Sequence, residues 1–282
     1  MTAPGPMSDT LPAQEPLIRG AIFSLVLLVM ALWEIVASRR LQGIQRRRRW
    51  PANLAIVVLD TLAVRLVFPL AAVGAALVAA EQGRGLFNLA PVPSWLALVA
   101  SVVVLDMAIY FQHRLFHLVP WLWRLHRMHH ADLEFDVTTG LRFHPLETLI
   151  SLGIKLAVVT LLGAPALAVL IFEVLLNATS MFNHGNVRLP ARLDRWLRLV
   201  LVTPDMHRVH HSIVRRETDS NFGFNLPWWD CLFGTYRDQP AAGHLGMTIG
   251  IENFRAPQDL RLHRMLLQPF VNPRRDGNQR RP

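Results

Sequence analysis

Cysteine is almost absent from this chain of 282 residues, because Cys231 is the only one. A single thiol excludes an internal disulfide and a CxxC metal pair, so its expected role is that of a small buried residue. Lysine is equally rare: Lys155 stands alone, and arginine supplies almost all of the formal charge of +9. Any metal site is therefore expected to use histidine, which occurs 12 times.

The basic balance has two candidate partners, nucleic acid and anionic lipid. No nucleic-acid motif accompanies the arginines, which instead flank apolar segments. We therefore expect a membrane partner and no nucleic acid.

Hydrophobic residues make up 52% of the chain, and its mean hydropathy of +0.28 is high for a soluble domain. The long apolar runs cover residues 18–38, 53–80, 95–110, 146–162 and 164–182. A cleaved signal peptide is an alternative for the first run, but no basic segment precedes it and arginines follow it, as in a retained anchor. The last two runs are short and meet at Gly163 and Pro165, which predicts a re-entrant or tightly turned hairpin. The predicted fold is an all-α, integral-membrane helical bundle of three spans plus a helical hairpin.

Eight histidines form three tight clusters with spacings of one to four residues. They are His113 and His117, then His126, His129 and His130, and finally His207, His210 and His211. Residues three or four apart share one face of a helix, and neutral imidazole is the commonest protein ligand of first-row transition metals. One such cluster can arise by chance, and isolated residues such as His244 and His263 are expected to be structural. Three clusters that end or follow apolar segments predict a site for two metal ions.

The arginines also predict an orientation. Their densest cluster, at residues 39–49, lies between the first two apolar runs and is expected in the cytoplasm. The later runs then return the chain to that side at about His113, and both ends of the hairpin lie there. We expect a multi-pass protein of the cell (inner) membrane, with a cytoplasmic helical cap that holds a His-rich di-metal site.

Charged residues inside apolar runs are costly and therefore informative. Lys155 and Glu173 lie nine residues on either side of Ala164, so we expect both at about 13 Å from the turn of the hairpin and within about 8 Å of each other. Asp60 and Arg65 are a weaker pair, because five residues is a poor helical spacing. For Glu34, in the first of these runs, the sequence indicates no partner.

Asp106 precedes His113 by seven residues, which is about two helical turns. We expect it on the same helix face as His113 and His117. There it would either orient an imidazole through the second ring nitrogen or lie at the interface, facing water.

Residues 95–237 resemble the integral-membrane fatty acid hydroxylase and sterol desaturase superfamily. The resemblance rests on Asp106-x-x-x-Tyr110-Phe111-x-His113-Arg114-x-x-His117, Trp123-Arg124-x-His126-x-x-His129-His130, Arg142-Phe143-His144-Pro145-x-Glu147, Phe182-Asn183-His184-Gly185-Asn186, Thr203-Pro204-x-x-His207-x-x-His210-His211, Asn221-Phe222-Gly223 and Trp229-Asp230-x-Leu232-Phe233-Gly234-Thr235-Tyr236. Residues 1–94 share only hydrophobicity with it. Where some members carry a fuller HxxxH, this chain has Ser180 four residues before His184.

The resemblance implies a non-haem di-iron centre that uses O2 to oxidise an unactivated C–H bond of a lipid, by hydroxylation or desaturation. It implies that the eight clustered histidines are metal ligands and that His184 is a ninth. His144 is implied to lie beside the centre as a support or outer ligand; alternatively, it caps a helix start against Glu147. Asp230 and Asn221 are expected to shape the cap, although Asn221 is also a candidate partner of an imidazole.

The chemistry agrees with iron as the metal, although zinc can occupy such a site in purified protein. Attack on an alkyl C–H bond requires an oxidant that no side chain or zinc-bound water provides. The Glu and ExxH motifs of soluble di-iron bundles are missing at these clusters. The printed sequence also has no dinucleotide-binding glycine pattern, haem signature or cysteine cluster, so electrons are expected from a separate ferredoxin or cytochrome/reductase.

Two other functions remain open at this point. A zinc-dependent membrane hydrolase also uses histidine ligands, but normally with few per metal and a neighbouring carboxylate base, as in HExxH, which is absent. A His-cluster metal transporter or sensor normally holds its ion near the middle of the membrane, whereas these clusters follow the spans.

The expected organisation has four parts. They are a disordered N-terminus at 1–17, membrane anchor helices at 18–94, a fatty acid hydroxylase/sterol desaturase-like catalytic domain at 95–237, and a partly disordered C-terminal extension at 238–282. Proline-rich and polar composition underlies the expectation for the two ends.

Overall fold

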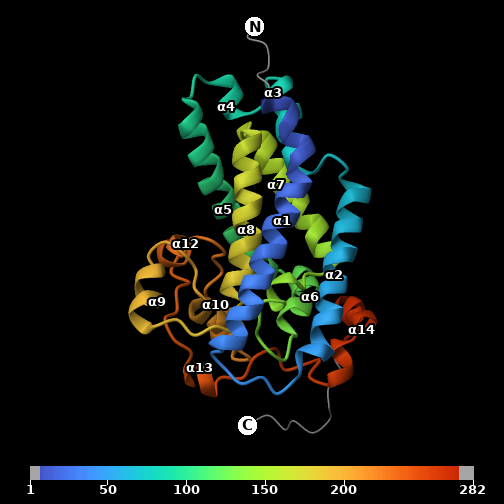
Figure 1. Ribbon diagram of the computed structural model, residues 1–282, viewed down its shortest axis with the longest axis vertical. Coiled ribbons are helices and arrows are strands. Elements are labelled where there is room, and N and C mark those ends of the chain that lie inside the picture. Colours follow the sequence, from blue (N-terminus) through green and yellow to red (C-terminus); the bar gives the residue numbers. More distant parts are fainter. Residues whose placement is uncertain (1–6, 273–282) are drawn as a thin grey trace.

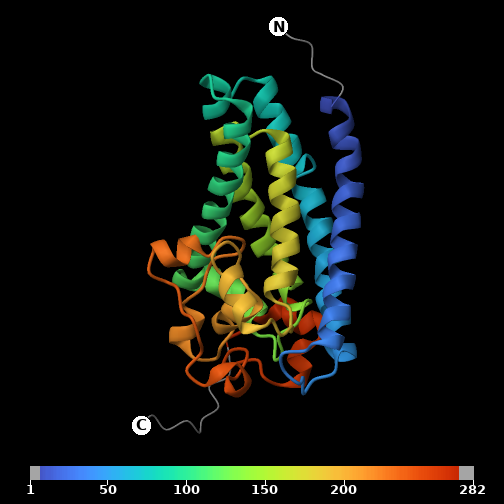
Figure 2. The same cartoon turned by 60° about the vertical axis from the view of Figure 1, so that its left-hand side comes forward.

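Long helices form a bundle in the computed structural model, which describes residues 7–272, and short helices form a cap at one end of it (Figures 1 and 2). The bundle contains α1 (Met7–Val36), α2 (Arg46–Val67), α3 (Ala71–Glu81), the connecting α4 (Leu86–Leu89), α5 (Ser94–Leu118), α7 (Pro145–Leu162) and α8 (Ala166–Asn183). The cap contains α6 (Pro120–His130), α9 (Ala191–Leu197), α10 (Pro204–His210), α11 (Arg215–Thr218), α12 (Trp228–Leu232), α13 (Gly243–Gly246) and α14 (Leu262–Leu267), with the 3₁₀ turns η1 (Thr139–Leu141), η2 (Pro257–Leu260) and η3 (Gln268–Phe270). Between residues 7 and 272 there is no strand, only two isolated bridges. The all-α prediction is confirmed.

Five segments are long and apolar enough to cross a membrane. They are Gln14–Val36, Arg46–Leu89, Ser94–Leu118, Pro145–Leu162 and Ala166–Asn183. The second segment contains α2, α3 and α4, and its helix is interrupted at Pro69, which has no backbone N–H to donate. The predicted integral-membrane bundle is confirmed, with the hairpin α7–α8 providing two of the five segments.

The hairpin turns at Gly163, whose φ of +63° is a left-handed conformation that glycine adopts without strain. A Cβ atom on Gly85 would overlap the Gly163 backbone, so the two glycines pack directly on each other. Gly85 belongs to the connection between α3 and α5, at the end of the bundle opposite the cap (Figure 1). The hairpin therefore runs from the cap to the far end of the bundle and does not turn back halfway.

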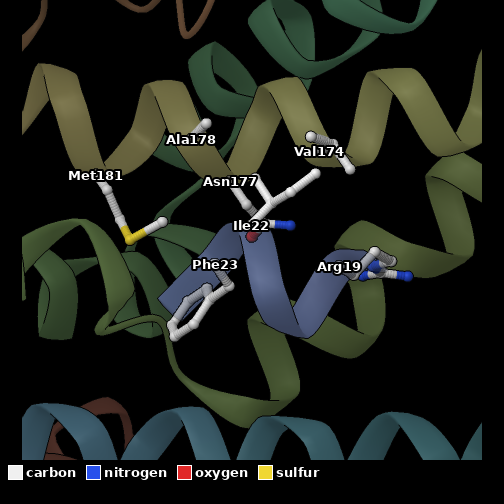
Figure 3. A pocket seen from close by; sticks show the side chains of 7 residues that line it. All are labelled: Arg19, Ile22, Phe23, Val174, Asn177, Ala178 and Met181. Carbon is white, nitrogen blue, oxygen red and sulfur yellow. The ribbon is translucent and has the colours of Figure 1, made fainter. Parts of the chain in front are cut away.

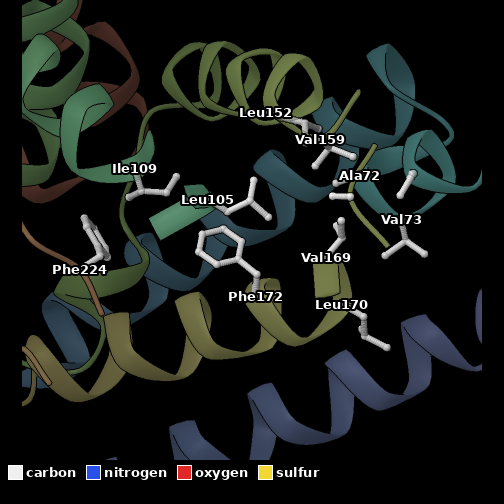
Figure 4. Packing of buried hydrophobic residues seen from close by; sticks show 12 residues of the cluster. Ala72, Val73, Leu105, Ile109, Leu152, Val159, Val169, Leu170, Phe172 and Phe224 are labelled. Carbon is white, nitrogen blue, oxygen red and sulfur yellow. The ribbon is translucent and has the colours of Figure 1, made fainter. Parts of the chain in front are cut away.

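An apolar core joins α3, α5, α7 and α8 (Figure 4). The cluster contains Leu105 and Ile109 of α5, Leu152 and Val159 of α7, and Phe172 of α8. Lipid is as apolar as these side chains, so within a bilayer their packing stabilises the bundle mainly through van der Waals contacts. This core holds α5 and α8, both of which carry histidines at their cap ends.

The predicted ion pair inside the hairpin is confirmed, because Lys155 Nζ lies 2.7 Å from Glu173 Oε1. Arg19 of α1 adds a second cation, with its Nη1 atom 2.8 Å from Glu173 Oε2. Arg19 and Asn177 also border a hollow of about 10 Å³ between α1 and α8 (Figure 3), which is room for about one water molecule. Sequence spacing did not predict Arg19 as a partner, because the packing of α1 against α8 is a tertiary contact.

The other charged residues of the spans have partners that local spacing did not predict. Asp60 accepts a hydrogen bond from Thr148 Oγ1 at 3.1 Å and, among the described residues, forms no ion pair with Arg65, which lies off its helix face. Glu34 accepts from Arg46 Nη2 at 2.9 Å and from the backbone N–H groups of Val137 and Asn186 at 2.7 and 2.8 Å. Glu34 thus ties α1 to two cap loops.

Two expectations about order and burial are wrong. α1 already begins at Met7, so the described part of the segment predicted to be disordered at 1–17 is helical. Extending an existing apolar helix costs far less than nucleating a new one. Cys231 is exposed on α12 rather than buried. Residues 1–6 and 273–282, which fall in the predicted disordered ends, lie outside the described residues.

The extension up to residue 272 is packed against α6. Arg124 Nε donates to the carbonyl of Pro269 at 2.5 Å, and Arg127 donates to the carbonyls of Gln268 and Val271. These bonds fix the helix that carries three of the clustered histidines.

Candidate metal centre

The histidines come together in the cap, at the ends of four helices. His113 and His117 lie in the last turns of α5, and His126, His129 and His130 end α6. His184 caps α8, His207 and His210 lie on α10, and His211 caps α10. All nine imidazoles are buried.

Local sequence explains why the chain turns at these points. Pro120, Pro145 and Pro204 each occupy the first turn of a helix, where the missing N–H costs nothing. Thr203 Oγ1 caps α10 by accepting from the backbone N–H of Met206 at 3.4 Å. The histidines that follow at spacings of three and four then project from one face of each short helix.

The nine imidazoles form two separate groups. The first group is His113, His117, His126, His130 and His210, and the second is His129, His184, His207 and His211. Within each group one ring nitrogen of every residue lies within 4.8 Å of the others. Each group draws on at least three helix ends, so neither would exist without the tertiary fold.

The nitrogen spacings suit shared metal ions. In the second group, His184 Nε2 lies 3.2 Å from His129 Nε2, 3.1 Å from His207 Nε2 and 3.2 Å from His211 Nε2. In the first group, His126 Nε2 lies 3.1 and 3.2 Å from the Nε2 atoms of His113 and His130. Two nitrogens bonded to one ion at ~2.1 Å are separated by ~3.0–3.4 Å for octahedral or tetrahedral angles.

The electrostatics also suit a cation. Burial lowers the pKa of His126 and of His184 to about 3, so both imidazoles are neutral at neutral pH and keep a lone pair for a metal. Burial, reinforced by neighbouring imidazoles, lowers the pKa of His129, His130, His207, His210 and His211 well below the usual value.

Two buried ring nitrogens of the first group, His117 Nε2 and His210 Nε2, have no hydrogen-bond partner among the described residues. Buried polar atoms are normally satisfied, and a metal ion held by the group would satisfy both. The residues present therefore fit a metal.

Several imidazoles are oriented through Nδ1, which leaves Nε2 free to face the centre. His113 donates to the carbonyl of Phe222 at 2.8 Å, and His210 donates to the carbonyl of Ser220 at 2.7 Å. In the second group, His184 donates to the carbonyl of Ser180 at 2.7 Å. Such bonds fix the tautomer and ring orientation of a metal ligand.

Two carboxylates orient imidazoles of the first group. His126 Nδ1 donates to Glu147 Oε1 at 2.6 Å, and both side chains are buried. His117 Nδ1 lies 3.3 Å from Asp219 Oδ1, and Asp219 is itself paired with Arg215 at 2.6 Å. Sequence reasoning missed both roles. The signal for Glu147 was its place in the Arg-Phe-His-Pro-x-Glu motif, as a carboxylate in the first turn of a helix.

Asp106 does not take the predicted role of orienting a histidine. Its Oδ2 atom accepts from Trp229 Nε1 at 2.8 Å and from the backbone N–H of Leu226 at 3.2 Å. The seven-residue spacing places Asp106 on the same side of α5 as His113, but the loop before α12 and Trp229 occupy the space next to its carboxylate. Asp106 therefore ties the cap to α5, as a buried group and not as one that faces water.

His144 does not join either group. Its Nδ1 accepts from the backbone N–H of Leu146 at 3.2 Å and caps α7, and its Nε2 lies 3.2 Å from the carbonyl of Leu266. His144 therefore caps the start of a helix, which was the alternative to a place beside the centre. Glu147 does not assist that cap, because it accepts from His126.

Asn221 and Asp230 shape the cap loop that carries Phe222. Asn221 Nδ2 donates to the carbonyls of Met206 and Arg237, both at 2.8 Å, and bonds no imidazole among the described residues. Asp230 accepts from the backbone N–H groups of Phe222 and Gly223 at 2.8 Å each. Burial raises the pKa of Asp230 to about 6, against the opposing effect of these bonds. The loop is thereby held so that the Phe222 carbonyl reaches His113.

A buried ion cluster supports the loop that follows α6, and sequence reasoning did not find it. Arg49 donates to Asp132 at 2.8 and 2.7 Å and to Asp136 at 2.6 Å. Burial alone would raise the pKa of Asp132, but the guanidinium groups of Arg49 and Arg142 outweigh it and hold that pKa below its usual range. The cluster joins the start of α2 to the residues directly after His129 and His130.

Ser180, which precedes His184 by four residues, serves the second group through its backbone. Its hydroxyl donates to the carbonyl of Gly140 at 2.8 Å, while its own carbonyl accepts from His184. The second group therefore contains four histidines and the first contains five.

Comparison with known proteins covers the region that holds the centre. Residues 98–235 match the protein family described as fatty acid hydroxylase. An ornithine lipid hydroxylase of Rhizobium tropici is 33% identical over 159 residues, which cover 55% of this chain and 47% of that protein. An alkylglycerol monooxygenase of Homo sapiens is 28% identical over 185 residues, covering 64% of this chain and 39% of that protein. A cholesterol 25-hydroxylase of Homo sapiens is 31% identical over 141 residues, covering 48% of this chain and 49% of that protein.

This chain therefore spans about half or less of the length of these curated relatives. No solved structure shows a significant match.

Proposed function

We propose that the chain belongs to the fatty acid hydroxylase family, whose model matches residues 98–235, and that it is a membrane-bound, O2-dependent di-iron oxidoreductase that hydroxylates, or desaturates, an unactivated C–H position of a lipid. The observation that carries the proposal is the pair of buried, all-histidine groups at the cap end of five apolar helices. The named activities of the relatives, on ornithine lipid, alkylglycerol and cholesterol, support a lipid as the substrate class.

The two groups are assigned one iron ion each. The five histidines of the first group and the four of the second would be the ligands, and Asp106, His144 and Asn221 would not. Bound iron would supply the O2 chemistry that side chains cannot perform. The chain's own contribution is to bury nine imidazoles away from water and to orient five of them through bonds at Nδ1.

The orientation and partners follow from the positions of charges and helices. The arginine-rich connection between α1 and α2 lies at the same end as the cap (Figure 1), where Arg40 donates to the carbonyl of Met247 at 2.8 Å. The positive-inside tendency then favours a cytoplasmic cap at the inner membrane. A separate ferredoxin or cytochrome/reductase would bring electrons to that face, and the lipid would come from the bilayer.

The test uses the full chain in lipid nanodiscs. We expect about two iron ions per chain by elemental mass spectrometry, and O2 consumption that depends on both reductant and lipid. His129→Ala is expected to abolish the oxidised lipid detected by mass spectrometry, whereas His263→Ala, at an exposed histidine outside both groups, is expected to leave it unchanged.

Two outcomes would overturn the proposal. Zinc as the native metal, with no O2 uptake for any lipid supplied, would favour the hydrolase alternative. An unchanged lipid profile in cells that lack the intact gene would remove the lipid substrate.

A further inference from the structure

Two short cap helices, α9 and α12, expose apolar side chains that the described part of the chain leaves uncovered. Trp196 of α9 is 66% exposed and Leu232 of α12 is 70% exposed. The two segments touch, because Trp228 Nε1 donates to the carbonyl of Leu199 at 2.6 Å. The α9–α12 surface comprises Leu193, Trp196, Leu199, Val200, Trp228, Leu232 and Phe233.

This surface lies against a membrane span. Trp229 of α12 is hydrogen-bonded to Asp106, in the middle of α5, and the ring of Phe233 lies 4.9 Å from the ring of Phe111. Phe111 is itself exposed on α5, so the α9–α12 surface continues the side of α5 that faces lipid. Figures 1 and 2 show α12 at the edge of the cap nearest the bundle, beside α5.

The exposed charge at α9 itself is positive, and the exposed carboxylate nearby, Asp238, pairs with Arg198 at 2.8 Å. Arg188, Arg192 and Arg195 are exposed at α9, whereas the one acidic residue of that helix, Asp194, is paired with Arg198 at 2.7 Å. Tryptophan with arginine at the edge of an apolar patch is typical of segments that lie in the headgroup layer, where anionic lipid attracts the arginines.

We propose that the α9–α12 surface is embedded in the headgroup layer of the leaflet next to the histidine groups, with anionic lipid as its partner. The cap is then anchored at two places, by the ends of the spans and by this surface. The anchor is connected to the centre: Asp230 of α12 holds the backbone of Phe222, and the Phe222 carbonyl accepts from His113. The position, exposure and charge of this surface favour its embedding whatever reaction the centre performs.

The test measures membrane depth with spin labels on the full chain in nanodiscs. Cys231→Ser removes the one native thiol, and a single cysteine is then introduced by Leu232→Cys or, as the matched control, by Leu245→Cys. Leu245 is 69% exposed, but it belongs to α13, at the end of the cap far from the bundle (Figure 1). We expect the label at 232 to collide more with O2 than with a water-soluble nickel chelate, and the label at 245 to show the reverse.

A label at 232 that is as accessible to the nickel chelate as the label at 245 would overturn the proposal. Protection from both reagents that disappears on dilution would also overturn it, because it would indicate a second copy as the partner.

A second measurement tests the lipid charge. The depth of the label at 232 is expected to increase when phosphatidylglycerol replaces part of the phosphatidylcholine, and the double variant Arg192→Gln/Arg195→Gln is expected to abolish that increase. A depth that does not depend on lipid charge would contradict anionic lipid as the partner. Both measurements report membrane depth and not turnover. The proposed anchor and the proposed reaction are therefore tested independently.

Discussion

The contact between Glu147 and His126 gives the sharpest prediction about the candidate metal centre. His126 Nδ1 lies 2.6 Å from Glu147 Oε1, and both side chains are buried. Glu147→Ala leaves the imidazole N–H without an acceptor and frees the ring to turn. Loss of such a supporting bond costs about 10–100-fold in metal affinity, which corresponds to about 1.4–2.8 kcal/mol. Because His126 belongs to the first group alone, we expect one of two bound ions to become labile.

The assay counts metal per chain by elemental mass spectrometry after dialysis against a graded series of chelator. Over the range in which the unsubstituted chain keeps two ions, Glu147→Ala should fall to about one. Glu147→Gln should lie between them, because its amide oxygen still accepts the hydrogen bond without the charge. Glu252→Ala, at an exposed position, serves as the surface control, and thermal unfolding of the metal-free forms separates weaker binding from misfolding. Retention of both ions by Glu147→Ala, or equal loss of both, would refute the reasoning.

Three further predictions concern stability. The pKa of His126 is about 3 in the fold and about 6.5 when unfolded, so the unfolded chain binds more protons between these pH values. The free energy of unfolding of the metal-free protein should therefore fall by about 1.4 kcal/mol per pH unit from this residue alone as pH falls from 6.5 toward 3. A flat unfolding temperature between pH 7.5 and 5.5 would contradict this. Glu173→Gln should lower the free energy of unfolding by up to about 3–5 kcal/mol. Lys155→Met should lower it less, because Arg19 on α1 still pairs with the Glu173 carboxylate after loss of the lysine. Equal unfolding temperatures of the two variants would argue against that shared arrangement. Gly85→Ala should lower the unfolding temperature more than Gly83→Ala, since both have positive φ but only the Cβ at 85 meets backbone.

The sequence predicted those parts of the molecule that depend on local spacing. Intervals of three and four residues placed histidines on common helix faces, and equal distances from Ala164 placed Lys155 and Glu173 at one depth. Both arguments need only helix geometry and the position of a turn.

The partners of the histidines could not be predicted in the same way. Glu147 reaches His126 because α7 packs beside α6, and Asp106 turns to Trp229 because the cap loop occupies that side of α5. Arg49 lies more than 80 residues before Asp132, so no local pattern relates them. Helix faces follow from the sequence, whereas contacts between faces depend on how the helices dock.

The bonds from α6 to the extension have a consequence for the order of assembly during synthesis. Arg124 and Arg127 donate to backbone carbonyls at residues 268–271. These carbonyls leave the ribosome some 140 residues after the helix that they hold. Every histidine of the centre is therefore synthesised before α6 has its final support. A nascent chain that ends between residues 211 and 268 carries all nine imidazoles without this anchor, so stable metal loading is expected only once these last described residues have docked.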